Sequence, residues 1–309
     1  MIKVDNLKKA YGTIRAVDDI SFEVNKGEIV GFLGPNGAGK TTTMKILTCF
    51  IGATSGTASI AGLDVERQPL EVRAKVGYLP ESAPLYHDMD VVTFLRFIAE
   101  VRQIEAAKLP ARLDQITQIC GLKTVMRRPI GELSKGFRQR VGLAQAIIHD
   151  PDVLILDEPT SGLDPNQIIE IRELIRNLGK EKTVILSTHI LPEVSAVCDR
   201  AIIINEGKIV GSGTLAELSA SSKEYVLAKL RGDRNAIEAR LRSFGGADQV
   251  RHVGEADGLH TFEITPIHGQ KIAEAVFRLA ADNGFSLAEL RTEGASLEDV
   301  FTRLTRSGQ

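Results

Sequence analysis

The sequence predicts an α/β protein: a parallel-sheet core with an inserted helical subdomain, followed by a small α+β domain. Three observations carry this prediction. A continuous apolar run at 29–33 leads into a glycine-rich turn and then a helical pattern, which is typical of a parallel α/β unit. Apolar residues at helical spacing recur through 84–148. Alternating strand patterns and amphipathic helices recur after 223.

The composition is that of an ordinary globular protein. The 309 residues are 43% apolar and 25% charged, so the chain is long enough for about two domains with cores of normal size. No apolar run approaches the ~18 residues of a membrane span, and the first residues lack the apolar stretch of a secretory signal. We therefore expect a chain that does not cross a bilayer by itself.

Charge and cysteine content argue against a nucleic-acid-binding, metal-binding or disulfide-rich protein. The 38 basic and 40 acidic residues leave a net charge of -2, which argues against broad nucleic-acid binding because that needs a basic face. The three cysteines, Cys49, Cys120 and Cys198, are too far apart for a metal site or a disulfide framework. Reduced thiols buried as small hydrophobic groups are the better interpretation.

The first 80 residues are expected to hold short strands and turns around one helix. Strands are predicted at Ile2–Val4 and Ser21–Val24, and the apolar run Ile29–Leu33 is a buried strand. The helix follows the glycine-rich turn, at Thr41–Cys49.

The stretch 84–148 changes character and is interpreted as a helical subdomain inserted in the α/β core. Its three predicted helices lie at Val92–Ile104, Ala111–Cys120 and about 136–148. The third is stopped by Asp150-Pro151, because the residue before a proline disfavours helix.

The α/β pattern then returns and completes a domain at 1–219. Its predicted elements are the strands Val153–Leu156 and Val184–Leu186, a helix at Gln167–Leu178, a hairpin of Ala201–Asn205 with Lys208–Ser212, and a short helix at Leu215–Ser219. Ser219–Ser222 is a plausible linker.

Residues 223–309 are predicted to form a second domain. The order of its elements is β-α-β-β-α-β, the ferredoxin-like split βαβ arrangement. The predicted elements are Tyr225–Leu230, Asn235–Leu241, Gln249–Val253, His260–Ile264, Gln270–Ala281 and Phe285–Leu290, with a last helix at Ser296–Leu304.

One motif predicts a triphosphate site. Residues 34–41 read G-P-N-G-A-G-K-T and fit the phosphate-binding pattern G-x-x-x-x-G-K-[ST]. Glycines allow backbone N–H groups to converge on phosphate oxygens, and the following helix directs its positive end at them. The Lys40 ammonium suits the β- and γ-phosphates, and the Thr41 hydroxyl suits Mg²⁺. The predicted nucleotide-binding residues are Gly34, Pro35, Asn36, Gly37, Ala38, Gly39, Lys40, Thr41 and Thr42.

Two adjacent carboxylates end the apolar strand Val153–Leu156. Asp157 is then expected to lie near Mg²⁺, directly or through water, and Glu158 near the γ-phosphate, where it can accept a proton from attacking water. Alone, the pattern fits a solvated acidic turn equally well. The phosphate-binding motif in the same chain favours the catalytic interpretation.

Together these motifs resemble, over residues 1 to about 220, the ATP-binding subunits of ABC transporters. Further matches occur in the family's order: Leu133-Ser134-Lys135-Gly136-Phe137 stands at the LSGGQ signature, Ser161–Asp164 resembles the D-loop, His189 resembles the switch histidine, and Tyr11 resembles the aromatic that stacks on adenine.

The resemblance implies a head-to-tail dimer with ATP between one phosphate loop and the other copy's signature. Ser134 and amides near Gly136 would then bind a γ-phosphate across the interface. His189 would contact the γ-phosphate and orient Glu158, and Tyr11 would stack on adenine. Without the resemblance, His189 is a satisfied core histidine and Tyr11 a half-buried residue at a strand end.

Two departures from the family pattern stand out. Glu81, in Tyr-Leu-Pro-Glu, replaces the glutamine that senses Mg²⁺, and its carboxylate can still reach Mg²⁺ through water. Lys135 and Phe137 replace the commonest glycine and glutamine of the signature. This variant, with a Ser-Leu-Glu-Asp-Val-Phe ending at 296–301, resembles the ABC-2 exporter ATPases of the drug-export and gliding-motility types.

The resemblance therefore implies an MgATP-hydrolysing subunit that energises a separate polytopic permease, lying on the inner face of the cell membrane through it. Its partners would be that permease and a second ATPase subunit, with no nucleic acid. The alternative is an ABC ATPase that acts on ribosomes or DNA without a permease. Residues 223–309 would be an accessory domain, and a sensor or a dimerisation module remains open for it.

Overall fold

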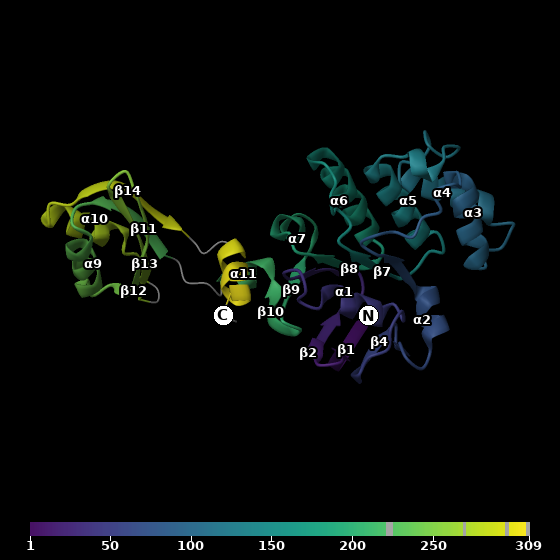
Figure 1. Cartoon of the computed structure of the whole chain (residues 1–309), viewed down its shortest axis with the longest axis horizontal. Helices are drawn as coiled ribbons and strands as arrows, with labels where there is room; N and C mark the ends of the chain where they lie inside the picture. The colour runs from purple at the N-terminus through teal and green to yellow at the C-terminus, as the bar shows by residue number, and fades with distance from the viewer. Residues whose placement is uncertain (221–224, 268–269, 294–296, 307–309) are drawn as a thin grey trace. The chain divides into compact units, whose positions relative to one another are not determined.

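The computed structural model describes residues 1–220, 225–267, 270–293 and 297–306 (Figure 1). Within them the chain forms two compact units, one of Met1–Leu215 and one of Ala216–Arg306. No helix in these ranges is both long enough and apolar enough to span a membrane.

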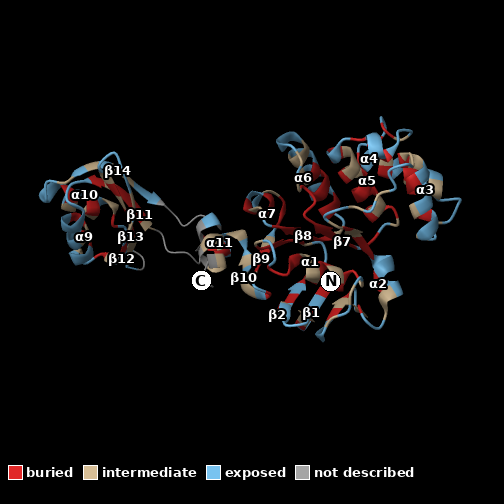
Figure 2. Cartoon of the chain, in the orientation of Figure 1, coloured by how far each residue is buried: buried red, intermediate tan, exposed pale blue. Residues whose placement is uncertain are grey.

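A six-stranded sheet is the centre of the first unit, in the order β10-β9-β3-β8-β7-β6. Its strands are parallel except β10, which pairs antiparallel with β9. The predicted strand β3 is confirmed and buried throughout. Figure 2 shows β8 and β7 of the same sheet in the red of buried residues. The bounds are β3 Ile29–Leu33, β6 Val76–Leu79, β7 Val153–Asp157, β8 Thr183–Thr188, β9 Arg200–Asn205 and β10 Lys208–Thr214.

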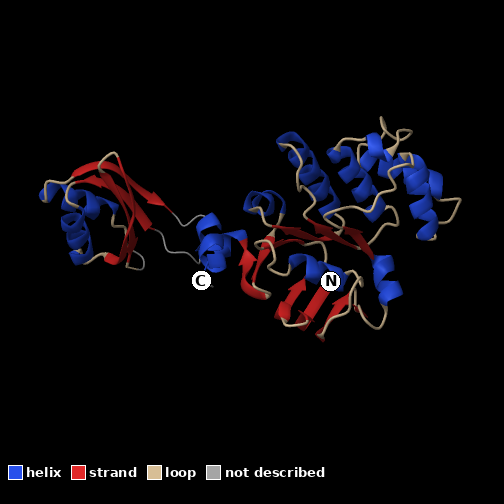
Figure 3. Cartoon of the chain, in the orientation of Figure 1, coloured by secondary structure: helices blue, strands red, loops and turns tan. Residues whose placement is uncertain are grey.

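An antiparallel sheet in the order β2-β1-β4-β5 forms the second layer of this unit (Figure 3). Its strands are β1 Ile2–Tyr11, β2 Ile14–Val24, β4 Ser55–Ile60 and β5 Leu63–Asp64. Helix α1, Lys40–Leu47, contacts strands of both sheets, and one apolar core joins them. β1 and β2 extend well beyond the predicted strands, because their polar outer halves pair through shifts in register that an alternating pattern does not show.

The three predicted helices of the inserted subdomain are confirmed as α3 Val91–Val101, α4 Leu109–Ile119 and α5 Lys135–Ile147, with a short 3₁₀ turn at Ile130–Glu132. The prediction of a single helix before residue 80 is wrong, because α2 occupies Pro69–Lys75. Helix α7, Leu191–Val197, was not expected either. Each is a seven-residue helix with proline in its first turn, too short to show helical periodicity.

Helix α6 runs from Pro165 to Gly179, starting two residues before its predicted range. Helix α1 ends at Leu47 rather than at Cys49, since Cys49 adopts a left-handed backbone with φ of 57°. Ser219 of the expected linker lies in helix α8, Leu215–Ala220, and the linker's last two residues lie outside the described ranges.

The second unit contains an antiparallel sheet in the order β12-β13-β11-β14. Since the elements follow as β11-α9-β12-β13-α10-β14, the topology is the predicted ferredoxin-like one. Helix α10 begins three residues later than predicted, and Ser296 lies outside the described ranges. The bounds are β11 Tyr225–Arg231, α9 Arg234–Ser243, β12 Ala247–Ala256, β13 Leu259–Pro266, α10 Ala273–Asp282, β14 Ser286–Glu293 and α11 Leu297–Arg306.

A partly buried histidine in the first unit makes the stability of that unit sensitive to acid. His149 follows α5, and its Nε2 lies 3.1 Å from the carbonyl oxygen of Val76. Burial and, to a smaller extent, the nearby cations Arg102 and Arg112 together lower the pKa of His149 to about 4. An unfolded histidine, with a pKa of 6.5, takes up its proton first, so the unfolding free energy falls as pH drops from 6.5 towards 4.

Replacing His149 by glutamine is expected to remove this contribution. Integrated over the shift, the wild type should lose about 2 kcal/mol more unfolding free energy than the variant between pH 7 and pH 5. Urea denaturation of both proteins at the two pH values measures the difference. Identical pH dependence of the two proteins would show that His149 is not the acid-sensitive group.

Candidate functional site

The loop between β3 and α1 is shaped to surround an anion. Gly37 and Gly39 adopt φ of 80° and 105°, a region that side chains disfavour. A Cβ at Gly39 would also collide with the carbonyl oxygen of Ala16. Because Gly39 is the N-cap of α1, the unpaired N–H groups of the first helical turn direct their positive end towards this loop.

Lys40 holds a buried cation beside this loop. Its Nζ donates to the carbonyl oxygens of Gly34 and Pro35, at 2.8 and 3.1 Å. It also lies 3.4 Å from the Oε1 atom of Glu158. With the residue only 6% exposed, this ammonium is weakly screened by water and acts strongly on any anion in the loop.

Glu158 joins Lys40 to His189. Its Oε2 atom lies 2.9 Å from the Nδ1 atom of His189. The glutamate has a left-handed backbone with φ of 48°, and its N–H donates to the carbonyl oxygen of Ser187 at 2.9 Å. Such a conformation is uncommon for glutamate, and here it follows β7 where the side chain can meet both partners. The carboxylate is therefore a positioned proton acceptor.

Asp157 lies at the end of β7 and is fully buried. Its Oδ1 atom accepts a hydrogen bond from Ser187 Oγ at 2.7 Å, whereas Oδ2 is buried without a partner. Burial raises the pKa of Asp157, while the hydrogen bond from Ser187 and the nearby Thr41 hydroxyl lower it. A carboxylate oxygen without a partner beside a threonine hydroxyl offers the hard oxygen ligands that Mg²⁺ prefers.

A cavity of about 480 Å³ collects most of the predicted site residues. The predicted residues that line it are Asn36, Gly37, Gly39, Lys40, Thr41, Thr42, Glu81, Glu158 and His189. Gly34, Pro35 and Ala38 belong to the loop without lining the cavity, and Asp157 is buried outside it. Ser161, the first residue of the segment that resembles the D-loop, also lines the cavity, as does Ala16, which the sequence analysis did not single out.

Tyr11 does not line this cavity. It ends β1 with an exposed fraction of 49%, and Lys9 Nζ lies 5.3 Å from the centroid of its ring. Its exposure thus matches the half-buried residue at a strand end that the sequence alone predicts. Its stacking on a base stays a prediction.

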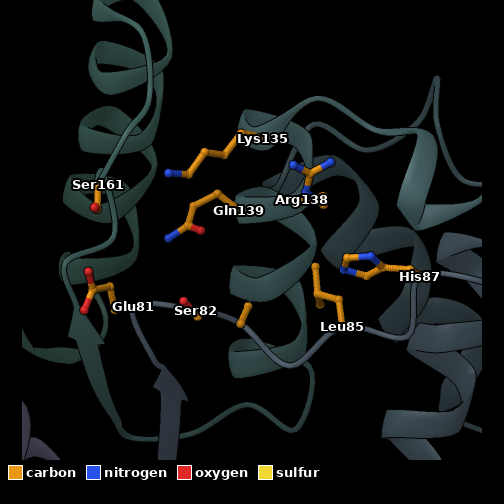
Figure 4. Close-up of a pocket in the computed structure, with 9 residues that line it drawn as sticks. Glu81, Ser82, Leu85, His87, Lys135, Arg138, Gln139 and Ser161 are labelled. Carbon is orange, nitrogen blue, oxygen red and sulfur yellow. The ribbon is translucent and has the colours of Figure 1, made fainter.

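Ser134 and Gly136 do not line it either. Both lie at the start of α5, where Ser134 is the N-cap and its Oγ accepts from Phe137 N at 3.3 Å. The intervening Lys135 lines a second cavity of about 220 Å³, shown in Figure 4. Glu81 and Ser161 line both cavities and lie on the same side of the second one in Figure 4.

The sequence interpretation missed the polar side chains that support the site from beneath. Ser187, Thr160, Thr188 and Glu193 are buried and hydrogen-bonded. Ser187 and Thr188 directly precede His189, so the sequence shows that they lie near the site. It does not show their hydrogen-bond partners, because these lie on other elements. Glu193 lies on α7, a helix that the sequence did not reveal.

Comparison with known proteins identifies the family. A family model described as "ABC transporter" matches residues 17–161, which include the phosphate loop and Glu158. A transport ATP-binding protein, BcrA of Bacillus licheniformis, named for bacitracin, is 33% identical over 100% of this chain and 98% of its own length. The chain belongs to the ABC transporter family. As an ATP-binding subunit of this family it is an ATPase.

Other relatives of this ABC ATPase also match along nearly their whole length. The Nod factor export ATP-binding protein I of Paraburkholderia xenovorans is 34% identical over 98% of this chain and 96% of its own. The ABC transporter ATP-binding protein YxlF of Bacillus subtilis is 32% identical over 99% of this chain and 100% of its own length.

Solved structures of ABC cassettes share the fold of the first unit. The ATP-binding subunit of an ABC transporter superposes with a TM-score of 0.65 and 30% identity, covering 72% of this chain and 92% of that one. The dimeric cassette MJ0796 gives a TM-score of 0.64 at 24% identity, and the match covers 70% of this chain and 99% of that one.

Proposed function

We propose that this ABC ATPase works as a head-to-tail dimer and energises a separate permease of the ABC-2 type that exports its substrate. The observation that carries the proposal is the contact of buried Lys40 and Glu158 with each other and of Glu158 with His189, all lining one cavity. Relatives matched from end to end are named for bacitracin transport and for Nod factor export, which supports export. The subunit would lie on the inner face of the cell membrane, held there by its permease.

The chain's own residues account for the chemistry. Backbone N–H groups of residues 36–42 and the Lys40 ammonium bind the triphosphate and neutralise charge that develops on the γ-phosphate. Glu158 accepts the proton of the attacking water. His189 contacts Glu158 through Nδ1, which leaves Nε2 free to contact the γ-phosphate.

Thr41 and Asp157 are the residues that would hold Mg²⁺, with Glu81 able to act through water. The buried Oδ2 atom of Asp157, which has no partner, fits this role. When bound, the ion would neutralise the β- and γ-phosphate oxygens.

The proposed dimer is supported by the absence of the signature residues from the lining of the phosphate cavity. Ser134 and Gly136 do not line it, although the N-terminus of the 13-residue helix α5 is suited to bind an anion. A second copy in head-to-tail orientation would bring its Ser134 and Gly136 to the γ-phosphate, with Asp164 beside the interface. Residues 223–309 would be accessory, since both cavities are lined by residues of the first unit.

The inserted subdomain offers an aromatic surface for the permease. Tyr86 and Phe97 have exposed fractions of 52% and 37%, and their ring centroids lie 5.6 Å apart. Tyr86 also packs edge-on against Phe94 of α3, at 6.0 Å. The surface begins five residues after Glu81, so a helix docked there could sense the cavity. Exposed aromatic clusters are typical binding anchors.

Changing both Tyr86 and Phe97 to glutamate is therefore expected to release the subunit from membranes. Loss of buried aromatic anchors should lower the membrane-bound fraction by at least about tenfold in cells that produce the native permease. ATP hydrolysis by the isolated subunit should be unaffected, because neither residue lines the cavity.

Phe50→Glu is the matched control, since Phe50 is 72% exposed and lies outside the inserted subdomain. It should stay with the membrane fraction. Retention of the double variant, or capture of ribosomal proteins by crosslinkers at Tyr86, would favour the alternative of an ABC ATPase without a permease.

A further inference from the structure

Glu193 of α7 is a buried carboxylate that lies outside both cavities and has no role in the chemistry above. It is 1% exposed. Its Oε2 atom accepts a hydrogen bond from Thr188 Oγ1 at 2.7 Å, and its Oε1 atom accepts one from Thr160 Oγ1. The closest cation is Arg172 of α6, with its guanidinium 3.9 Å from Oε1.

Through Thr188, Glu193 acts on the segment that carries His189. A carboxylate can only accept, so the Thr188 hydroxyl must give its proton to Glu193. The lone pairs of the Thr188 hydroxyl are then available to the backbone N–H of Ile190, which donates to Thr188 Oγ1 at 3.1 Å. The residues on both sides of His189 are fixed by this one hydroxyl. The Thr188 carbonyl also accepts from the N–H of Gly34, at 3.2 Å, so the same residue contacts the phosphate loop.

Through Thr160, Glu193 acts on the segment that carries Glu158. Thr160 lies in the tight turn that follows β7, where Ser161 N donates to the Glu158 carbonyl at 3.1 Å and Leu163 N donates to the Thr160 carbonyl at 3.2 Å. This turn continues to Asp164, which caps the N-terminus of α6. One carboxylate therefore holds the turn after Glu158 and the turn at His189 together.

Stability alone is a poor explanation for this arrangement. Burying a carboxylate requires its removal from water, and apolar residues of similar volume often stabilise a fold as well or better. The Glu193 carboxylate is held mainly by two hydroxyl groups rather than by a close cation. The two threonine hydroxyls, bound to one carboxylate, instead fix the spacing between the two turns. The side chains of these turns, Glu158 and His189, must be in contact.

We propose that Glu193 is a positioning residue for ATP hydrolysis. By accepting from Thr160 and Thr188 at once, it sets the register between the two turns and so holds the contact of 2.9 Å between Glu158 Oε2 and His189 Nδ1. Glu193 lines neither cavity, so its replacement should affect turnover rather than nucleotide binding.

A matched pair of threonine variants on one strand tests this role. Thr183 begins β8 and Thr188 ends it, and both are buried. Each hydroxyl accepts from one backbone N–H, that of Gly27 for Thr183 and that of Ile190 for Thr188. Thr183→Val and Thr188→Val therefore remove the same kind of hydrogen bond, but only the second removes a donor from Glu193.

The expected result separates turnover from stability. Thr188→Val and Glu193→Gln should lower kcat for ATP by about 10- to 100-fold, as small misplacements of catalytic groups do, with KM within about twofold of the wild type. Thr183→Val should also lower the unfolding temperature but keep kcat within about twofold. Thr188→Ser retains the hydroxyl and should restore most of the activity.

Three outcomes would overturn the proposal. In the first, Thr188→Val and Thr183→Val reduce kcat equally. In the second, Glu193→Gln turns over ATP at the wild-type rate. In the third, Thr188→Ser is as slow as Thr188→Val. The threonine variants test the positioning role of Glu193 even where Glu193→Gln fails to fold. The wild-type rate in the same assay tests the ATPase activity itself.

Discussion

Glu158→Gln should abolish steady-state ATP turnover while leaving ATP bound. Glutamine keeps the shape and can keep contact with His189, but its amide is a very weak proton acceptor. Loss of a positioned general base reduces rates by about 10²- to 10⁴-fold. Phosphate release measures turnover, and nucleotide binding at equilibrium provides the second readout.

Glu28→Gln is a suitable control for this substitution. Glu28 is also a largely buried carboxylate in an ion pair, 2.7 Å from Arg200, but it lies outside the cavity. Its variant should hydrolyse ATP normally. Wild-type turnover by Glu158→Gln would exclude Glu158 as the base.

Lys40→Ala should lose ATP affinity by about 10- to 100-fold, since a hydrogen bond to a charged group contributes about 1.5–3 kcal/mol. The substitution also leaves Glu158 buried without its cation. Breaking a buried ion pair destabilises a protein by about 3–5 kcal/mol at most sites, and the neighbouring His189 can offset part of this. Nucleotide titration and urea denaturation measure the two effects separately.

Lys45→Ala provides the comparison on the same helix. Lys45 lies in the last turn of α1, where its Nζ is 5.9 Å from the ring centroid of Phe50, outside the cavity. It should bind ATP as the wild type does. Equal loss of affinity in both variants would indicate a general effect of α1 and contradict a specific role of Lys40.

The parts of the site predicted best are those encoded by adjacent residues. The strand β3, the loop and the start of α1 are continuous in the chain, and each favours the same structure, so the motif alone placed residues 34–42 correctly in the fold. Asp157 and Glu158 likewise follow directly from the end of a buried strand.

What could not be predicted depends on contacts between distant segments. Nothing near Glu193 in the sequence shows that its carboxylate meets Thr160, which lies 33 residues earlier. Helix α7 is too short for its periodicity to stand out, so the sequence did not single out Glu193. The backbone of Ala16 approaches Gly39 only because the antiparallel sheet and β3 share a core with α1.

The central claim, a catalytic site shared by two copies, is tested most directly by the molar mass of Glu158→Gln in solution. Light scattering with saturating MgATP should show the mass doubling from that of a monomer, because ATP is bound but not hydrolysed. Adding Gly136→Asp, which places a negative charge where the partner's γ-phosphate would lie, should keep the protein monomeric with ATP still bound. A monomeric mass for Glu158→Gln at saturating MgATP would contradict the shared site.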